Sequence, residues 1–433
     1  MMAVRDFAKR RLPPRLWQRI SAVYWWMEEW ARERRLRLKW AVGLDHSAID
    51  WPWFKRADDP HLALIHRLAL REDWRRISTW DARLVLVARS VLWPFVAAAG
   101  CARAIRTDGH RVTAARGLGR LAQARKIMRL ALRYNLPPIA YYKFGLFDVI
   151  PEKRCLHYLH NQEIVNVLTA LNAGSEVKHY DHKLLFAKAA GRLGLRAASP
   201  IVEFRSGEAY AWWRKPERLP ETDLVAKLAD STWGIGFERW DYAGAGQWQE
   251  GERRKTEAEL LRHCAARASR REVLLQERLV NHPALARLAC RGLATARIVT
   301  FSRRDGVADV FMATFRMPTG ESRVDNFAAG GLAAPVELAT GRLGVAVRKK
   351  VASEVATHPD TNGQIEGVTL PYWNEARELV LQAHSRFGDL PFVGWDVAIT
   401  ADGPVLVEAN PIWCGELLQI PSRKPLGDTA FPE

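Results

Sequence analysis

Three side chains that could bind a metal ion lie close together near the C-terminal end of the sequence. Asp396 falls within one apolar run, Glu408 and Asn410 fall within the next, and Ala401-Asp402-Gly403 separates the two runs. A glycine that follows Asp between such runs is typical of a hairpin turn, because glycine readily adopts positive φ. The pattern therefore predicts two antiparallel strands that carry these three residues.

The length of the predicted loop decides which side chains face one another. With a three-residue loop, Thr400 pairs with Pro404 and, counting back, Asp396 pairs with Glu408. Asn410 shares their face, because residues two apart on a strand point the same way. Like charges directly opposed destabilise a sheet unless a cation lies between them, and carboxylate and amide oxygens suit Mg²⁺. The hairpin is therefore predicted to hold magnesium, with open positions for nucleotide phosphates.

Two other interpretations of this hairpin stay open. In an exposed hairpin the acids would simply face water, although both acids here lie inside apolar runs, where an unpaired charge is costly. A two-residue turn at Asp402-Gly403 would shift the pairing by one residue and move Asp396 to the opposite face.

A lysine and a loop of small residues form a second candidate site. Lys227 lies near the end of an expected strand, and a loop that contains Gly234 and Gly236 follows it. The backbone N–H groups of such loops often bind phosphate. An ordinary hairpin explains the same pattern, so this signal is weak by itself.

The elements that must position these residues alternate between strands and helices. Strands are predicted at 200–204, 223–228, 296–301 and 308–315, a strand that turns into a loop at 273–280, and helices at about 181–194, 251–270 and 373–386. Antiparallel strands with helices between and around them predict an α+β fold.

The N-terminal region, residues 1–135, is predicted to be helical and basic. Helical patterns cover 60–76, 80–104 and 112–134, with Asp108-Gly109 as a break between the last two. The most apolar stretch, 84–102, is interrupted by Arg89 and Pro94. Its uncharged part is shorter than the roughly 20 residues that span a bilayer, so we expect a buried helix there.

Residues 1–40 combine tryptophans with a run of arginines on a helical pattern. Such a helix could lie in the interface of an anionic membrane. The alternative is a helix that packs its aromatic side chains on the next domain while the arginines face water. The tryptophans are spread around the helix, which favours the alternative.

The whole chain of 433 residues has an ordinary hydrophobic content of 48% but a net charge of +17. This charge favours anionic partners such as nucleotides, acidic glycans or a membrane face. The five cysteines are scattered and lack metal-ligand spacing, which favours a reduced, cytoplasmic compartment. The charges that follow the first residues leave no secretory signal there.

From about residue 135 to its end, the sequence resembles the ATP-grasp superfamily, most closely its sugar-transfer-associated branch. The resemblance rests, in this order, on Asp181-His182-Lys183, Val225-Ala226-Lys227, 276–280, 295–300, 325–331, Gly394-Trp395-Asp396 and Glu408-Ala409-Asn410-Pro411. The last two segments are the most specific and the lysine loop is the least. The resemblance implies two α+β lobes that hold ATP between them, after a helical N-terminal region. The expected domains are 1–135, a smaller lobe with its linker at 136–275, and a larger lobe at 276–433.

The resemblance also implies roles for individual residues. The residues expected to bind ATP are Lys183, Lys227, Gly234, Gly236, Gln276, Glu277 and Leu279. The lysines would contact the phosphates from the smaller lobe, and the last three would form a hinge whose backbone reads adenine. Arg297 and Asn326 would stabilise the γ-phosphate and an acyl phosphate made from it. The three hairpin residues would hold two Mg²⁺ ions.

Three departures from the family pattern stand out. Trp233 and Ile235 crowd the loop after Lys227, where relatives have more glycines, so the phosphate lid is expected to close differently. Ala328 stands where relatives often carry a histidine, so any role of that side chain is lost. The N-terminal region is helical where many ATP-grasp ligases have an α/β substrate domain.

The function implied is an ATP- and Mg²⁺-dependent carboxylate–amine ligase. A substrate carboxylate would attack the γ-phosphate, and an amine would displace phosphate from the acyl phosphate to form an amide. The branch name points to polysaccharide or glycoconjugate biosynthesis, with small-molecule or sugar-linked carboxylate and amine substrates. One alternative is a kinase-like phosphotransferase. Another is a non-catalytic adaptor of a glycan-assembly complex at the inner face of the membrane. Nucleic acid is not an expected partner, because no reader motif accompanies the charge.

Overall fold

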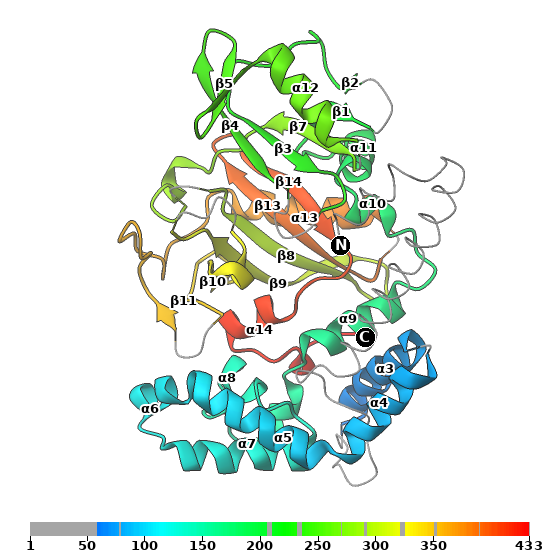
Figure 1. Cartoon of the computed structure of the whole chain (residues 1–433), viewed down its shortest axis with the longest axis vertical. Helices are drawn as coiled ribbons and strands as arrows, with labels where there is room; N and C mark the ends of the chain where they lie inside the picture. Colours follow the sequence, from blue (N-terminus) through cyan, green and yellow to red (C-terminus); the bar gives the residue numbers. More distant parts are fainter. Residues whose placement is uncertain are drawn as a thin grey trace, which may run out of the picture.

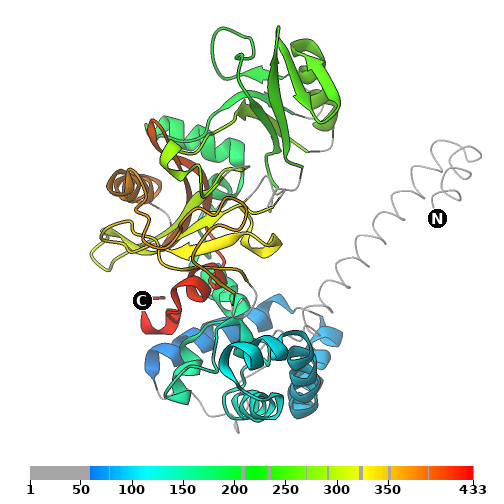
Figure 2. The same ribbon diagram turned by 90° about the vertical axis from the view of Figure 1, so that its left-hand side faces the viewer.

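The computed structural model describes residues 59–77, 79–205, 210–231, 236–269, 271–289, 292–320, 325–349, 353–388 and 390–432. The tryptophan- and arginine-rich segment 1–40 lies outside these residues, as do Trp233, Gly234 and Ile235. The described residues form an α+β molecule of three parts: a helical region and two antiparallel sheets. In Figure 1 and Figure 2 the helical region and the first sheet lie at opposite ends, with the second sheet between them.

The helical region consists of short helices around a common core. The helices are α3 Pro60–Arg76, α4 Trp80–Val91, α5 Trp93–Ala104, α6 His110–Arg116, α7 Arg120–Tyr134, α8 Ala140–Lys143 and α9 Asn161–Leu171. Asp59 caps α3 by accepting a hydrogen bond from the His61 N–H at 2.9 Å. Trp93 of α5 donates from its indole N–H to the Ala131 carbonyl of α7 at 2.9 Å, which joins these two helices.

Two helices of this region differ from prediction. The helix predicted over 80–104 is two helices, because Pro94 at the start of α5 cannot continue a helix from the preceding turn. The break predicted at Asp108-Gly109 is wrong: a π-helix, η1 Ile105–Gly109, continues directly into α6. The chain turns instead at Gly117, whose φ of +69° is easy only for glycine.

The long apolar stretch of this region does not form a continuous span. Among the described residues, no single helix is both long enough and apolar enough to cross a bilayer. The segments Trp80–Val91 and Trp93–Arg116 meet the length and composition criteria only as a pair, and they are bent by 78° relative to each other.

The first sheet has the strand order β2-β1-β7-β3-β4-β5-β6. Its strands are β1 Pro200–Phe204, β2 Ala211–Trp212, β3 Leu224–Leu228, β4 Glu238–Gly244, β5 Gln247–Glu250, β6 Arg253–Thr256 and β7 Val273–Glu277. The helices α11 Lys183–Arg192 and α12 Glu257–Arg267 pack on it. The helix predicted at about 251–270 starts only at Glu257, because β6 occupies the preceding residues. Thr256 and Glu259 form a capping box at this start.

The second sheet has the order β12-β11-β10-β9-β8-β13-β14. Its strands are β8 Thr295–Ser302, β9 Ala308–Met317, β10 Leu332–Pro335, β11 Ala346–Val347, β12 Glu354–Val355, β13 Phe392–Thr400 and β14 Gly403–Asn410. The predicted strands at 200–204, 223–228, 296–301 and 308–315 and the helix at 373–386 (α13 Trp373–Phe387) are confirmed within a few residues.

The two faces of the second sheet have different partners. Val393, Trp395 and Val397 of β13 belong to one core with residues of α13. Phe392, on the opposite face, joins Trp413 and the helical region in a second core. Since Asp396 is four residues beyond Phe392, it shares the face that contacts the helical region.

The predicted domain limits at 135/136 and 275/276 stay predictions. The first follows directly after α7, which ends at Tyr134. The second falls inside β7, and all five residues of that strand belong to the first sheet.

Candidate functional site

The hairpin β13–β14 places Asp396 opposite Glu408, as predicted, but by a different route. The turn has two residues, so Thr400 pairs with Gly403 and not with Pro404. A bulge between Asp396 and Val397 then adds one residue on β14 and restores the predicted pairing of the acids. Gly403, with φ of +106°, provides the positive φ that the turn requires.

The Asp396 carboxylate is held by two arginines from neighbouring strands. Arg297, directly opposite on β8, donates from Nε to Oδ1, and Arg316 of β9 donates from Nη2 to Oδ2 at 2.7 Å. Asp396 is only 2% exposed. Burial alone would raise the pKa of Asp396, but Arg297 and Arg316 outweigh it and hold the pKa well below its usual range. Asp396 is therefore an ionised carboxylate with both oxygens engaged.

Glu408 behaves in the opposite way. Burial raises the pKa of Glu408, and the neighbouring Asp396 charge raises it further, while Lys183 acts against both. Two carboxyl groups this close ionise together only when a cation accompanies them, and otherwise one keeps a proton. This need for positive charge between the acids is what a divalent cation would meet.

Glycine at 394 leaves room for this arrangement. A Cβ at that position would lie 3.3 Å from Cδ of Arg297 and 3.0 Å from Cβ of Trp413. Gly394 also accepts a hydrogen bond at 3.3 Å from Nδ2 of Asn410, its partner across the hairpin. This bond directs the amide oxygen of Asn410 away from the Gly394 carbonyl.

Sequence reasoning missed Arg316, which ties the site together. Its guanidinium also contacts Thr295 Oγ1, at 2.5 Å from Nη2, and lies 3.4 Å from Asp325 Oδ2. Thr295 in turn donates its hydroxyl hydrogen to Asp325 Oδ2 at 2.5 Å. A lone arginine inside the apolar strand β9 was the available signal, because a charge in such a position must be paired.

Lys183 and Lys227 approach the acids from the first sheet. Lys183 begins α11, donates its N–H to the Ala229 carbonyl at 2.9 Å, and directs Nζ to the Ser231 carbonyl. Burial lowers the pKa of Lys227 to about 8, while the charge of Glu408 acts in the opposite direction. The two lysines and the acid pair therefore meet where the two sheets face each other.

Other predicted residues lie in the loop after β3 and at the end of β7. Gly236, in the loop between β3 and β4, has φ of +73°, and a Cβ there would lie 2.6 Å from Leu228 Cδ1. Gln276 and Glu277 are the last two residues of β7, and Leu279 lies in the link that leads to the second sheet. This link first contacts the second sheet where the His282 N–H donates to the Ile399 carbonyl at 2.7 Å.

Asn326 has a local structural role. Its side-chain oxygen accepts the Ala328 N–H at 2.9 Å and caps the short helix η4 Phe327–Ala329. The neighbouring Asp325 contacts Arg316 and accepts a hydrogen bond from Thr295. The phosphate-stabilising role of Asn326 stays a prediction.

A magnesium site in this protein would need more than acids. In the part of the chain that the structure describes, no three His, Cys, Asp or Glu side chains gather so as to hold a metal ion. A cation would offset the repulsion between the two carboxylates of the acid pair, and the amide of Asn410 could add a third oxygen ligand. Nucleotide phosphates or water would have to supply the other positions.

The arrangement of two α+β sheet units, with lysines of one facing acids of the other, defines an ATP-grasp fold. The model of the family described as "Sugar-transfer associated ATP-grasp" matches residues 165–430, more than half of the chain. The chain belongs to this family, and the resemblance seen in the sequence is confirmed.

Several solved structures are similar at low identity. An L-amino acid ligase from Bacillus licheniformis matches at 16% identity and a TM-score of 0.33, covering 61% of this chain and 49% of that one. D-alanine–D-alanine ligase from Bacillus anthracis, complexed with ATP, matches at 10% and 0.33, covering 57% and 58%. An N5-carboxyaminoimidazole ribonucleotide synthetase with ADP matches at 11% and 0.31, covering 59% and 52%.

This chain thus spans about half the length of each of these solved structures. No curated protein matches the sequence.

Proposed function

We propose that this protein is an ATP- and Mg²⁺-dependent carboxylate–amine ligase that forms an amide through an acyl phosphate. The observation that carries the proposal is the meeting of Lys183 and Lys227 with Glu408 and Asp396 between the two sheets. Cations on one side and acids on the other are the parts that phosphoryl transfer requires. Membership of the ATP-grasp family supports the same reading.

Some site residues would bind the metal cation and others the anionic phosphates of ATP. Glu408 and the Asn410 amide would hold Mg²⁺, with Asp396 beside them, and the ion would neutralise charge on the transferred phosphoryl group. Lys183 and Lys227 would bind the phosphates from the first sheet. Arg297 is already fixed against Asp396, so its guanidinium needs little reorganisation to meet developing negative charge.

We propose the two substrates only by chemical class. One is a small-molecule or sugar-linked carboxylate and the other is an amine, in the assembly of a polysaccharide or glycoconjugate. The word "sugar-transfer" in the family description supports this setting.

Calorimetric titration of the purified protein with ATP, with and without Mg²⁺, tests the nucleotide site. Glu408→Gln should abolish the Mg²⁺ dependence, since it removes the carboxylate that lies opposite Asp396. Lys227→Met should weaken ATP binding at least about tenfold, the effect of losing one charged phosphate contact. Glu366→Gln, an exposed carboxyl outside the site, is the matched control and should bind as the wild type. Failure of the folded wild type to bind ATP would refute the proposal.

Trapping with hydroxylamine tests the acyl phosphate. With ATP, Mg²⁺ and pooled uronic and amino acids, a ligase should release phosphate and form a hydroxamate from its carboxylate substrate. A phosphorylated hydroxyl acceptor without hydroxamate would instead identify a kinase-like phosphotransferase.

A further inference from the structure

The exposed side of α4 and of the start of α5 is apolar. Trp80, Leu84, Val87 and Val91 recur at the spacing of one helical stripe and are all exposed, Trp80 by 74% and Val91 by 58%. Leu92, between the helices, and Phe95, 75% exposed, extend the stripe around the bend. We call these six residues the α4–α5 apolar face. The expectation that 84–102 is a buried helix is therefore wrong.

The polarity of α4 is inverted relative to an ordinary surface helix. Its core-facing side includes Arg89 and Ser90, both buried, beside Ala82 and Leu86. A surface helix normally turns its charges to water and its apolar stripe to the core. An exposed apolar patch of this kind usually marks an interaction site.

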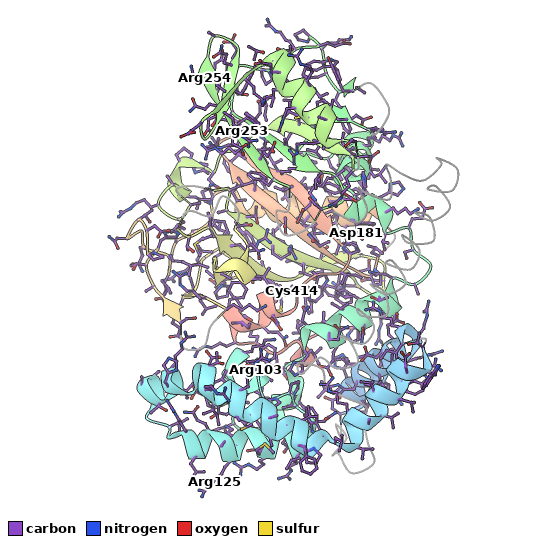
Figure 3. The ribbon with its side chains drawn as sticks, viewed as in Figure 1. Arg103, Arg125, Asp181, Arg253, Arg254 and Cys414 are labelled. Atoms are coloured by element: carbon purple, nitrogen blue, oxygen red, sulfur yellow. The ribbon has the colours of Figure 1, made fainter. Side chains whose placement is uncertain are left out.

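The helices that carry the α4–α5 apolar face belong to a strongly basic segment. Residues 60–134 contain fifteen Lys and Arg but only four Asp and Glu. Three of the acids, Glu72, Asp73 and Asp108, are buried, and Asp81 is partly buried. The exposed charged side chains of this region are therefore mainly cationic, including Arg103 of α5 and Arg125 of α7, which Figure 3 labels. Two of its arginines pair with acids that follow it, Arg116 with Asp148 and Arg129 with Glu152.

We propose that the α4–α5 apolar face docks on an anionic lipid bilayer. Tryptophan, phenylalanine and leucine exposed on one side of a strongly basic helical segment are the composition of a surface that lies in a membrane interface. Anionic headgroups complement the exposed arginines, and the acyl boundary accepts the apolar side chains without requiring a matching groove. The bend of 78° places the two helices at an angle, with Leu92 at the corner between them.

Charge argues against two other occupants of this face. A second copy docking through the same face would bring two strongly basic segments together. The N-terminal segment 1–58 contains thirteen Lys and Arg against seven Asp and Glu, so it too has the same sign as the surface it would cover. An anionic partner alone offsets the positive field. This inference does not depend on the proposed ligase activity.

Flotation of the full-length protein with vesicles is the test. Vesicles of phosphatidylcholine with added phosphatidylglycerol should bind the wild type, and vesicles of phosphatidylcholine alone should bind it weakly. The double variant Trp80→Glu/Phe95→Glu should lose at least about tenfold in partitioning, since it replaces the two most exposed aromatic residues of the face. Val307→Glu changes an exposed residue in the β8–β9 turn and should bind as the wild type.

A second readout reports where contact occurs. An environment-sensitive fluorophore on Phe95→Cys should shift to the blue with anionic vesicles, and the same fluorophore on Val307→Cys should not. Unchanged flotation of the double variant, or a wild type that binds no anionic vesicle, would overturn the proposal. So would a concentration-dependent dimer that the double variant abolishes in the absence of lipid binding.

Discussion

The charged cluster of the second sheet and the α4–α5 apolar face break opposite rules of folding. On the sheet, Arg297 and Asp396 are buried, where charges are costly unless paired. On the helices, Trp80 and Phe95 are about three-quarters exposed, where large apolar side chains gain nothing from water. Local rules are most often broken where a protein binds something. The charged cluster offers charged groups to a ligand, and the α4–α5 apolar face offers apolar surface.

The two regions also differ in how far other residues of the protein offset the cost of a buried charge or of an exposed apolar surface. Asp396 is fully compensated by its arginines, so the cluster is stable without a ligand, whereas the acid pair with Glu408 is not. The apolar face has no such compensation among the described residues, and burial elsewhere in the helical region must stabilise it. Predictions that separate stability from binding test this difference.

Replacing Arg316 should have the largest effect on stability. Arg316→Met removes one of two partners of a buried carboxylate and also the guanidinium contacts of Thr295 and Asp325, so we expect a loss of about 3–5 kcal/mol in the free energy of unfolding. Urea denaturation measures this loss. Arg303→Met, an exposed partner of Asp305, should change it by less than about 1 kcal/mol. Equal effects of the two variants would show that the buried cluster contributes no more to the free energy of unfolding than an exposed ion pair.

A buried acid in the helical region sharpens the comparison, because it supports structure alone. Burial would raise the pKa of Glu163, but His66, 2.9 Å away, and His160 lower it to about 2 from 4.5. A depressed pKa stabilises the fold above the unfolded value, and this stability is lost as pH falls from about 4.5 toward 2. Glu163→Gln should therefore lower the free energy of unfolding by about 3 kcal/mol near pH 5.

The difference between wild type and Glu163→Gln should vanish as the pH approaches 2, which acid titration of the unfolding free energy measures. ATP binding by Glu163→Gln should stay that of the wild type at neutral pH. A loss of ATP affinity would mean that the helical region contributes to the nucleotide site.

Deleting Val407 should have the smallest effect. Val407 is the extra residue of the bulge, so without it the two-residue turn pairs Asp396 with Glu408 directly. ATP affinity with Mg²⁺ should stay within about tenfold of wild type. Inserting an alanine after Val407 should instead displace Glu408 from Asp396 and abolish Mg²⁺-dependent binding. If deletion and insertion were equally harmful, the opposed acids would not be the feature that matters.

The sequence predicted the hairpin better than it predicted the turn. Counting from a three-residue loop placed Asp396 opposite Glu408, and the structure reaches the same pairing through a shorter turn and a bulge. Local sequence does not distinguish these routes, because a bulge on β14 depends on how β13 already pairs with β8. Arg316 was predictable in principle, by the argument from apolar runs that identified the acids. Its partners were not, because they come from β8 and β13.

The apolar stretch 84–102 shows a limit of a different kind. Its pattern identifies helical faces correctly, but whether a face is covered depends on what packs there. Ile77, directly after α3, packs on α4, and Ala131 of α7 packs on α5, while the stripe from Trp80 to Phe95 stays exposed. No periodicity in the sequence contains that information.

Phe392 and Asp396 lie on the same face of one strand, four residues or roughly 13 Å apart. The helical region is anchored at the first position and the charged cluster is built around the second, with no loop between them. If the first sheet moved to admit the proposed nucleotide, the shared core at Phe392 would keep the helical region with the second sheet. A bilayer under α4 and α5 would therefore hold the reacting groups at one constant height throughout the catalytic cycle.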